Sequence, residues 1–309
     1  MSISRSLLLK ASRSTWLARQ MASRKFARRA VSRFMPGEEA GDALDAAQRL
    51  ASEGLGAVLT QLGENLASLG EAQGVRDHYL GVLDQIRSRG LTRSVISVKP
   101  SQLGLDLSLD ACLAHLDVLA ARARETGTGM LWIDMEDSSY VDRTLDLVRR
   151  LRQKHDNVGV CLQAYLRRTP ADLDALLPLK PGIRLVKGAY AEAPHVAYPE
   201  KRDVDLAYYA LAETLLAAAA RGEAFPVFGT HDRGLLDRIS ARASSLRVTD
   251  GSWEIHMLYG IRVRDQLELA AAGRKVRTLI SYGRSWFPWY MRRLAERPAN
   301  VWFVLRSMI

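Results

Sequence analysis

The feature of the chain that most restricts its fold is a regular alternation of short apolar runs with longer amphipathic segments. Between the runs, apolar residues recur with the helical period, as in 110–123, 140–154, 204–221, 235–243 and 263–272. Strands that alternate with helices pair in parallel through right-handed crossovers. Eight such units in roughly 250 residues predict an α/β fold, a (β/α)8 barrel preceded by N-terminal helices. The eight runs are 57–59, 95–98, 130–133, 158–162, 183–186, 225–228, 253–257 and 276–280.

A doubly wound sheet is the competing architecture, and its dinucleotide-binding form requires a fingerprint of three glycines after the first strand. Gly54-Leu-Gly56 has Leu59 at the third position. Gly127-Thr-Gly129 precedes a strand instead of following one. The chain contains no Walker-type glycine loop. Any nucleotide cofactor must therefore be held in another way.

The first 35 residues form an arm in which every charged residue is basic, from Arg5 to Arg33. This composition is typical of a helical arm with solvated charges, of a mitochondrial transit peptide and of a basic helix on a membrane surface. We favour the helical arm, because Phe34-Met-Pro-Gly37 ends it and a second helix is predicted over 38–50. Residues 36–309 are predicted to form one catalytic barrel domain.

Composition excludes several classes of protein. No apolar run is long enough to span a bilayer, and no aromatic-interleaved basic stripe follows the arm, so nucleic acid is not an expected partner. Cys112 and Cys161 lie in apolar patterns and indicate a reducing, cytoplasmic location, with the arm able to contact the inner face of the membrane. The six histidines lack ligand spacing, so no metal is expected. Oligomeric state is not indicated.

Polar residues recur where the predicted strands end, and a barrel carries its chemistry at that rim. The set contains more cations than anions, which suits a ligand with a carboxylate or phosphate. No nucleophile and base pair stands out, which favours chemistry done by a bound cofactor. The residues are Glu64, Lys99, Asp134, Gln163, Arg184, Lys187, Tyr190, Thr230, His231, Asp232, His256 and Tyr259, with Arg292, Arg293 and Glu296 beyond the last strand.

The stretch Arg184-Leu-Val-Lys-Gly-Ala-Tyr190 places two cations in an apolar strand. One interpretation is that the long side chains reach solvent. The other is an anionic or electron-rich ligand at the strand end, which Gly188 allows to come close to the backbone.

Seven motifs in order resemble the FAD-dependent proline dehydrogenases, and the monofunctional bacterial members are the most similar. The resemblance extends from about residue 33 to the C-terminus. The motifs are Leu62-Gly-Glu64, Val98-Lys-Pro-Ser-Gln-Leu-Gly104, Ile133-Asp-Met-Glu-Asp137, Arg184 to Tyr190, Phe228-Gly-Thr-His-Asp232, Met257-Leu-Tyr-Gly260 and Tyr290-Met-Arg-Arg-Leu-Ala-Glu-Arg-Pro-Ala-Asn300.

The resemblance implies a distorted, TIM-like barrel with FAD across the strand C-termini. It implies oxidation of L-proline to 1-pyrroline-5-carboxylate by hydride transfer to flavin N5, the first step of proline catabolism. Arg184 would contact the N5 region and Gln163 the ring edge. The remaining cofactor-binding residues would be Val186, Lys187, Gly188, Ala189, Lys201, Thr230, His231, Asp232 and Glu296.

The same resemblance implies the substrate site. Lys99, Arg292 and Arg293 would hold the carboxylate, and Asp134 would position Lys99. The ring would pack on Leu185, Tyr190 and Leu258, and Glu64 would pair with Arg292 as a gate over the bound substrate.

Leu279 departs from the pattern, because proline-selective members usually have a tyrosine there. The change predicts broader selectivity, or another cyclic or N-alkylated amino acid as substrate, unless Tyr282 compensates.

Relatives pass electrons to quinone, so quinone is the expected electron acceptor. Two alternatives stay open: a barrel lyase with a Schiff base on Lys187, and a basic membrane-surface or nucleic-acid binding module.

Overall fold

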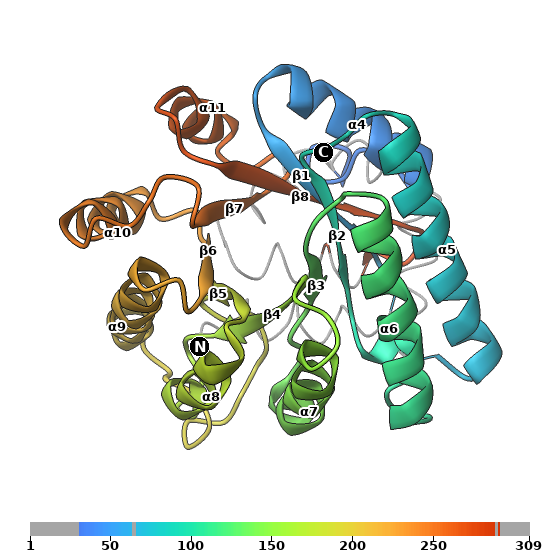
Figure 1. The fold of residues 1–309 in the computed structure, drawn as a ribbon, viewed down its shortest axis with the longest axis horizontal. Helices are drawn as coiled ribbons and strands as arrows, with labels where there is room; N and C mark the ends of the chain where they lie inside the picture. The colour runs from blue at the N-terminus through green and yellow to red at the C-terminus, as the bar shows by residue number, and fades with distance from the viewer. Residues whose placement is uncertain (1–30, 64–65, 288–289, 291–309) are drawn as a thin grey trace, which may run out of the picture.

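The computed structural model describes residues 31–63, 66–287 and 290. Eight parallel strands close into a barrel in chain order, with β8 paired to β1 (Figure 1). All eight predicted runs are strands, so the predicted barrel is confirmed. The strands are β1 (Gly56–Gln61), β2 (Ser94–Val98), β3 (Leu131–Ile133), β4 (Val158–Gln163), β5 (Gly182–Val186), β6 (Phe225–Gly229), β7 (Glu254–Leu258) and β8 (Val276–Tyr282).

Helices surround the barrel, and they include α5 and α8, which the sequence analysis did not name. Ser68, Ser108 and Asp232 start helices α5, α6 and α10 by accepting a hydrogen bond from a backbone N–H of the first turn. The helices are α4 (Ala40–Ser52), α5 (Leu69–Ser88), α6 (Leu109–Glu125), α7 (Val141–Arg152), α8 (Thr169–Leu176), α9 (Lys201–Ala220), α10 (Arg233–Ser245) and α11 (Val263–Ala271). Short 3-10 turns lie at Ser101–Leu103, Ser138–Tyr140 and Leu177–Leu179.

Strand residues alternate between the barrel interior and an outer apolar layer under the helices. Val58, Trp132 and Val227 belong to one apolar cluster although they come from β1, β3 and β6. Strands so far apart can meet only inside the barrel. Leu185 instead belongs to the larger apolar cluster that the helices cover. This alternation decides which strand residues can reach a ligand.

Helix α4 packs on both β1 and β8 (Figure 1). In a regular barrel the helix after the last strand fills that outer groove. Here a helix that precedes β1 fills it, with Ala43, Leu44 and Ala47 buried. The chain after β8 is therefore not needed in the groove, and the barrel departs from the regular order of helices in this way.

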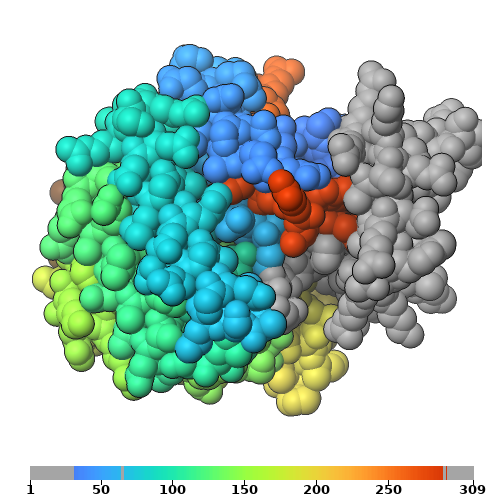
Figure 2. Space-filling model, turned by 90° about the vertical axis from the view of Figure 1, so that its right-hand side faces the viewer, coloured from blue at the N-terminus to red at the C-terminus, as the bar shows by residue number. Residues whose placement is uncertain are grey.

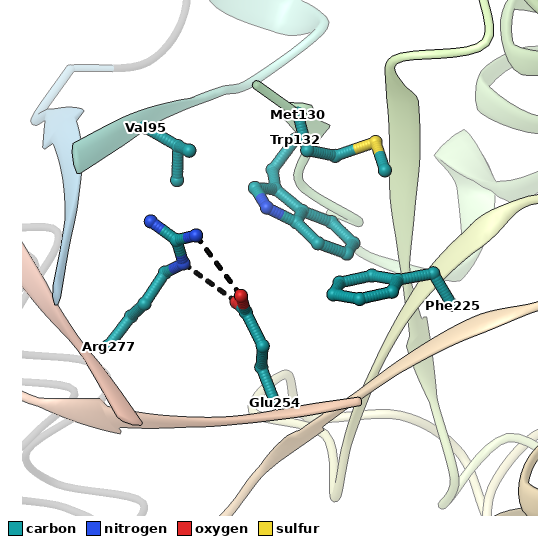
Figure 3. A pocket seen from close by; sticks show the side chains of 6 residues that line it. All are labelled: Val95, Met130, Trp132, Phe225, Glu254 and Arg277. Atoms are coloured by element: carbon teal, nitrogen blue, oxygen red, sulfur yellow. Dashed lines mark hydrogen bonds and ion pairs between the residues drawn. The ribbon is translucent and has the colours of Figure 1, made fainter. Parts of the chain in front are cut away.

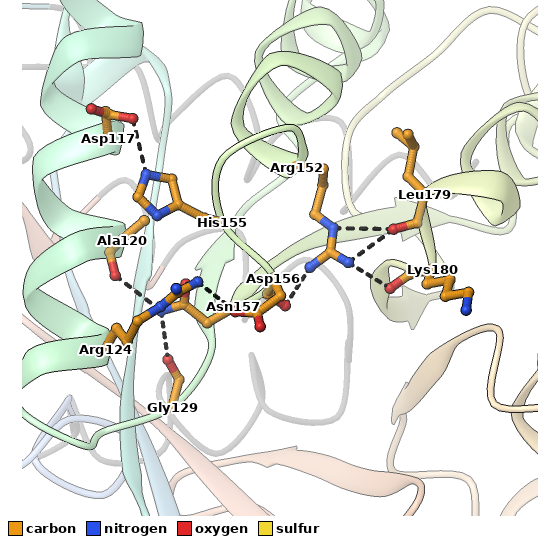
Figure 4. A network of polar contacts seen from close by, with 10 residues as sticks. All are labelled: Asp117, Ala120, Arg124, Gly129, Arg152, His155, Asp156, Asn157, Leu179 and Lys180. Carbon is orange, nitrogen blue, oxygen red and sulfur yellow. Dashed lines mark hydrogen bonds and ion pairs between the residues drawn. The ribbon is translucent and has the colours of Figure 1, made fainter.

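The N-terminal ends of the strands form the end of the barrel opposite the rim. A polar network ties this end together (Figure 4): Arg152 donates to the carbonyls of Leu179 and Lys180, both at 2.8 Å, and His155 pairs with Asp117 at 2.9 Å. A cavity of about 170 Å³ also lies here, and its lining residues are at or next to the first residues of strands (Figure 3). It is lined by Val95, Met130, Trp132, Phe225, Glu254 and Arg277.

Candidate active site at the C-terminal rim

Arg184 is a buried cation inside the barrel, with 3% of its surface exposed. Its Nη2 donates to Ser97 Oγ at 3.0 Å and to the Asp134 carboxylate, which also accepts from Ser97 Oγ at 2.8 Å. The guanidinium lies over the Trp132 ring at 5.4 Å. Although burial opposes the charge, the Asp134 carboxylate raises the pKa of Arg184 above its ordinary value. The site therefore holds a permanent, fixed positive charge.

The second terminal nitrogen of Arg184, Nη1, is buried without a hydrogen-bond partner among the residues that the structure describes. A buried donor in this state is costly, and a ligand atom that accepts a hydrogen bond removes that cost. A flavin ring edge carries such acceptors, so the orphaned nitrogen fits a flavin. Asp134 contacts Arg184 and Ser97, and its role in positioning Lys99 stays a prediction. Lys99 is half-buried directly after β2.

Gln163 ends β4 and is 2% exposed. Its amide Nε2 donates to the carbonyl of Glu136 at 2.8 Å. The Glu136 carboxylate accepts from the backbone N–H of Ser101 at 3.0 Å and from the Ser101 hydroxyl at 2.5 Å. The Gln163 side-chain amide is therefore held in place by the loop after β3, which the loop after β2 supports in turn. Gln163 is on β4, the strand next to the one that carries Arg184.

Lys187 and Lys201 are paired with two carboxylates. Lys187 Nζ lies 2.5 Å from Asp205 and 3.1 Å from Asp232, and Lys201 also contacts Asp205. Burial works against the two carboxylates, but Lys187 holds the pKa of both below the ordinary value. Asp232 also starts α10, accepting from the N–H of Leu235 at 3.2 Å. The cluster joins the ends of β5 and β6 to α9, and the side chain of Lys201 keeps 76% of its surface exposed.

Gly188 has φ +117° and lies against the ring of Tyr165. A Cβ at this position would stand 2.2 Å from Tyr165 Cδ1. The Tyr165 backbone N–H donates to the Lys187 carbonyl at 2.9 Å, so the two loops are joined beside the glycine. The backbone at Gly188 therefore approaches a side chain of this protein closely, and the close approach of a ligand there stays a prediction.

We expect Gly188→Ala to lower the free energy of unfolding by about 1–3 kcal/mol, because it combines left-handed backbone strain with a steric clash. Gly222→Ala is the matched control, since Gly222 has φ +70° with no atom near its added Cβ. Thermal unfolding of the two variants and their flavin content measure the difference. Equal behaviour of the two would show that contact with Tyr165 has no role in shaping the rim.

The apolar candidates divide between the two faces of the sheet. Leu258 and Leu279 are paired neighbours on β7 and β8, both half-buried, and Leu279 packs on the interior cluster. Leu185 is fully buried in the outer layer, so the prediction that it packs on a substrate ring is wrong. Tyr282 is buried on the outer side, 2.9 Å from His78 Nε2, and cannot compensate for Leu279.

The loop after β6 is built around local hydrogen bonds. The backbone N–H of Leu258 donates to His231 Nε2 at 3.2 Å, which indicates a neutral imidazole with its proton on Nδ1. The Thr230 hydroxyl, buried at 7% exposure, accepts from the N–H of Asp232 at 3.2 Å. Val186, Ala189 and Tyr190 are half-buried along the neighbouring loop.

Several predicted residues lie outside the described residues: Glu64, Arg292, Arg293, Glu296 and the first 30 residues of the arm. The sequence analysis also missed Ser97, Trp132, Tyr165 and Asp205. Ser97 could have been found, because it lies two positions before Lys99, and residues two apart in an extended chain lie on the same face. In the part of the chain that the structure describes, no cluster of metal-ligating side chains was found. No helix within it is long and apolar enough to cross a membrane.

Comparison with known proteins identifies the class. Residues 43–306 match the proline dehydrogenase family. The chain is 36% identical over 277 residues to proline dehydrogenase 1 of Bacillus subtilis (strain 168), covering 90% of both proteins. It is 35% identical over 284 residues to proline dehydrogenase of Deinococcus radiodurans, again covering 90% of both.

Solved structures agree with the fold. Proline utilization A (PutA) from Bdellovibrio bacteriovorus superposes with a TM-score of 0.80 at 23% identity, covering 87% of this chain and 33% of that chain. A Bradyrhizobium japonicum PutA mutant gives 0.75 at 25% identity, covering 91% and 32%. The fold and the sequence similarity together define an oxidoreductase that acts on a CH–NH group. The chain belongs to the proline dehydrogenase family.

Proposed function

We propose that the protein oxidises L-proline to 1-pyrroline-5-carboxylate with FAD, the first step of proline catabolism. The observation that carries the proposal is the buried Arg184, whose Nη1 lacks a partner among the described residues at the rim where the family's motifs meet. FAD, when bound, supplies an acceptor for the hydride that leaves the proline carbon next to nitrogen. The fixed charge of Arg184 would stabilise negative charge on the reduced ring.

The residues of the rim have distinct roles in this proposal. Arg184 and Gln163 would hold the flavin ring, and the loop 186–189 would line it. Lys187, Lys201, Thr230, His231, Asp232 and Glu296 would serve the phosphate, ribose or adenine part. Lys201 supports this assignment, because its exposed ammonium can meet a phosphate while it stays near Asp205.

Lys99, Arg292 and Arg293 would hold the amino acid carboxylate, because paired guanidinium groups bind a carboxylate with two parallel hydrogen bonds. Leu258, Leu279 and Tyr190 would pack on the ring. Asp134 would position Lys99 and order the carboxylate site, and its contact with Arg184 supports the ordering role. Glu64 would close over the substrate by pairing with Arg292, and an unchanged rate and affinity in Glu64→Ala would remove that role.

The visible spectrum of the purified protein tests the function. We expect a yellow protein with flavin absorbance, which bleaches when proline is added without oxygen. A colourless protein that cannot take up FAD would refute the proposal. Bleaching by another cyclic or N-alkylated amino acid, but not by proline, would correct the substrate.

Selectivity should follow from Leu279, which faces the interior beside Leu258. An apolar wall rejects an added hydroxyl or methylene only modestly, by roughly 10–200-fold. We expect the protein to accept 4-hydroxyproline or a larger ring, and Leu279→Tyr to favour proline by about tenfold in relative kcat/KM. Steady-state rates with the three substrates measure this. An unchanged ratio would show that position 279 does not contact the ring.

The Schiff-base alternative has less support. A Schiff-base lysine must present a neutral amine, whereas Lys187 is held between Asp205 and Asp232.

Quinone would be the electron acceptor, with the basic arm contacting an anionic membrane surface. Reoxidation of the reduced protein by a quinone analogue in anionic vesicles, compared with neutral ones, tests both points.

A further inference from the structure

Glu136, which has no role in the proposed function, connects two parts of the rim. It lies in the loop after β3 and is 6% exposed. Its carboxylate accepts from the backbone N–H of Ser101 at 3.0 Å and from the Ser101 hydroxyl at 2.5 Å. Its own carbonyl accepts from the Gln163 amide at 2.8 Å. Glu136 therefore holds the loop after β2 with its side chain and the end of β4 with its backbone.

The loop that the Glu136 carboxylate holds is the one that carries Lys99. Lys99 follows β2 directly, and the 3-10 turn Ser101–Leu103 begins two residues later. The residue between them is Pro100, whose ring fixes its φ, here −57°. The Gln102 N–H donates to the Lys99 carbonyl at 3.1 Å and closes the turn. The position of Ser101 is therefore passed on to the backbone of Lys99 through a stiff connection.

The turn is buried and has neighbours on several sides. It packs on α5 and α6, which form the cyan to green surface in Figure 2. The side-chain amide of Gln102 donates to the carbonyl of Gln61 at the end of β1, at 3.2 Å. Loss of the Glu136 carboxylate would remove the two hydrogen bonds that fix the turn to the loop after β3. The turn could then shift along the rim while its helical packing remains.

We propose that Glu136 is a positioning residue that acts through Lys99 and sets how strongly the site prefers a carboxylate on its substrate. This rests on the proposed function, in which Lys99 binds the carboxylate and Gln163 the flavin ring. A lysine ammonium acts as a point charge, so its attraction for a carboxylate depends on where its backbone is placed. Gln163 is bonded to the Glu136 backbone, so a change of the Glu136 side chain affects the substrate side of the site alone.

The test compares proline with prolinamide, which keeps the ring and the amine but has an uncharged amide in place of the carboxylate. The ratio of kcat/KM for the two substrates measures the preference for the carboxylate. We expect Glu136→Ala to lower this ratio about tenfold, mainly by raising KM for proline, because only proline loses an attraction to Lys99. Flavin content should stay constant, since the contacts of Arg184 and Gln163 are unchanged.

Glu192→Ala is the matched control. The Glu192 carboxylate accepts from the backbone N–H of Ser138 at 2.8 Å and from the Ser138 hydroxyl at 2.7 Å, which is the same pair of contacts at a turn that does not carry Lys99. This variant should leave the ratio unchanged.

Glu136→Gln is the conservative variant. Its amide oxygen can accept from the Ser101 N–H while its amide NH2 donates to the Ser101 hydroxyl, because a hydroxyl can accept as well as donate. Both contacts are then kept without the charge, so Glu136→Gln should retain most of the preference for proline.

Three results would overturn the inference: an unchanged ratio in Glu136→Ala, an equal fall of the ratio in Glu192→Ala, or a loss in Glu136→Gln as large as in Glu136→Ala. If Glu136→Ala does not fold, Ser101→Ala replaces it, because it removes the hydroxyl and keeps the backbone N–H. Its ratio should fall by a smaller factor, and an unchanged ratio would again refute the role of Glu136. The unaltered protein distinguishes the two proposals: failure to bind flavin or to be reduced by proline refutes the function itself.

Discussion

Replacing Asp134 with alanine is expected to lower kcat/KM for proline at least ~100-fold and the free energy of unfolding by about 3–5 kcal/mol. The reason is that Arg184 is almost fully buried, and Asp134 is the carboxylate that it contacts. Without it, the guanidinium keeps its charge in a low-dielectric interior and loses its fixed orientation. Steady-state kinetics, urea unfolding and the flavin spectrum measure the three consequences.

Two further variants separate the effect of the Asp134 charge from the effect of the hydrogen bonds around it. Asp134→Asn keeps an acceptor oxygen but removes the charge, so an intermediate loss is expected. Ser97→Ala removes the two hydrogen bonds that one uncharged hydroxyl makes with the same pair, and should cost about 1.5–3 kcal/mol. If Asp134→Ala is no more damaging than Ser97→Ala, the ion pair does not hold Arg184 in place.

Acid should destabilise the protein through a buried group at the opposite end of the barrel. It is formed by Glu254 and Arg277, which Figure 3 shows, and by His256. Arg277 donates to Glu254 from Nε at 2.7 Å and from Nη2 at 3.1 Å, and His256 Nε2 lies 3.3 Å from the same carboxylate. Burial lowers the pKa of His256 to about 4. Burial would raise the pKa of Glu254, but its hydrogen bonds with His256 and Arg277 lower it to about 2.

Both folded pKa values lie below those of the unfolded chain, so the unfolded state binds more protons in acid. The contribution of His256 is complete above pH 6.5 and is lost as the pH falls to about 4. That of Glu254 is complete above pH 4.5 and is lost towards pH 2. Each amounts to about 3 kcal/mol, and the two are coupled because the groups are in contact.

Urea unfolding between pH 4 and pH 8 measures this loss. His256→Phe should flatten the dependence between pH 6.5 and pH 4, because a phenyl ring can still pack on Trp132 but does not titrate. His195→Gln is the control, since His195 is exposed. Glu254→Gln should lower stability by about 3–5 kcal/mol at pH 7, because Arg277 loses its counter-charge. A pH profile that is the same for His256→Phe and the unaltered protein would show that the loss arises elsewhere.

The strands could be predicted from the sequence because each is a short apolar run buried on both faces. Whether each strand residue points into the barrel or out toward the helices could also have been predicted. Once Arg184 points inward, Leu185 must point outward, and the same alternation places Leu279 and Tyr282 on opposite sides. The sequence analysis did not apply this rule, and its expectations for Leu185 and Tyr282 were wrong for that reason.

Partners across the barrel could not be predicted, because they depend on how strands and loops meet in space. Asp134 lies 50 residues from Arg184, and Asp205 lies 18 residues from Lys187. The sequence identified both cations as unusual but did not show which acids would face them. The contact between Gly188 and Tyr165 could not be predicted for the same reason, since Tyr165 belongs to the loop after the preceding strand, β4.

The position of α4 has a consequence for how the protein is made. The helix comes early in the chain, yet half of its docking surface belongs to β8, the last strand to leave the ribosome. The apolar stripe that includes Leu44 therefore stays uncovered through most of translation, and β1 waits equally long for its second neighbour. Strand pairing over such a distance in sequence is slow, and the folding intermediates that precede it expose hydrophobic surface and are prone to aggregate. Circular permutants that place α4 after β8 should therefore refold faster and aggregate less than the natural chain.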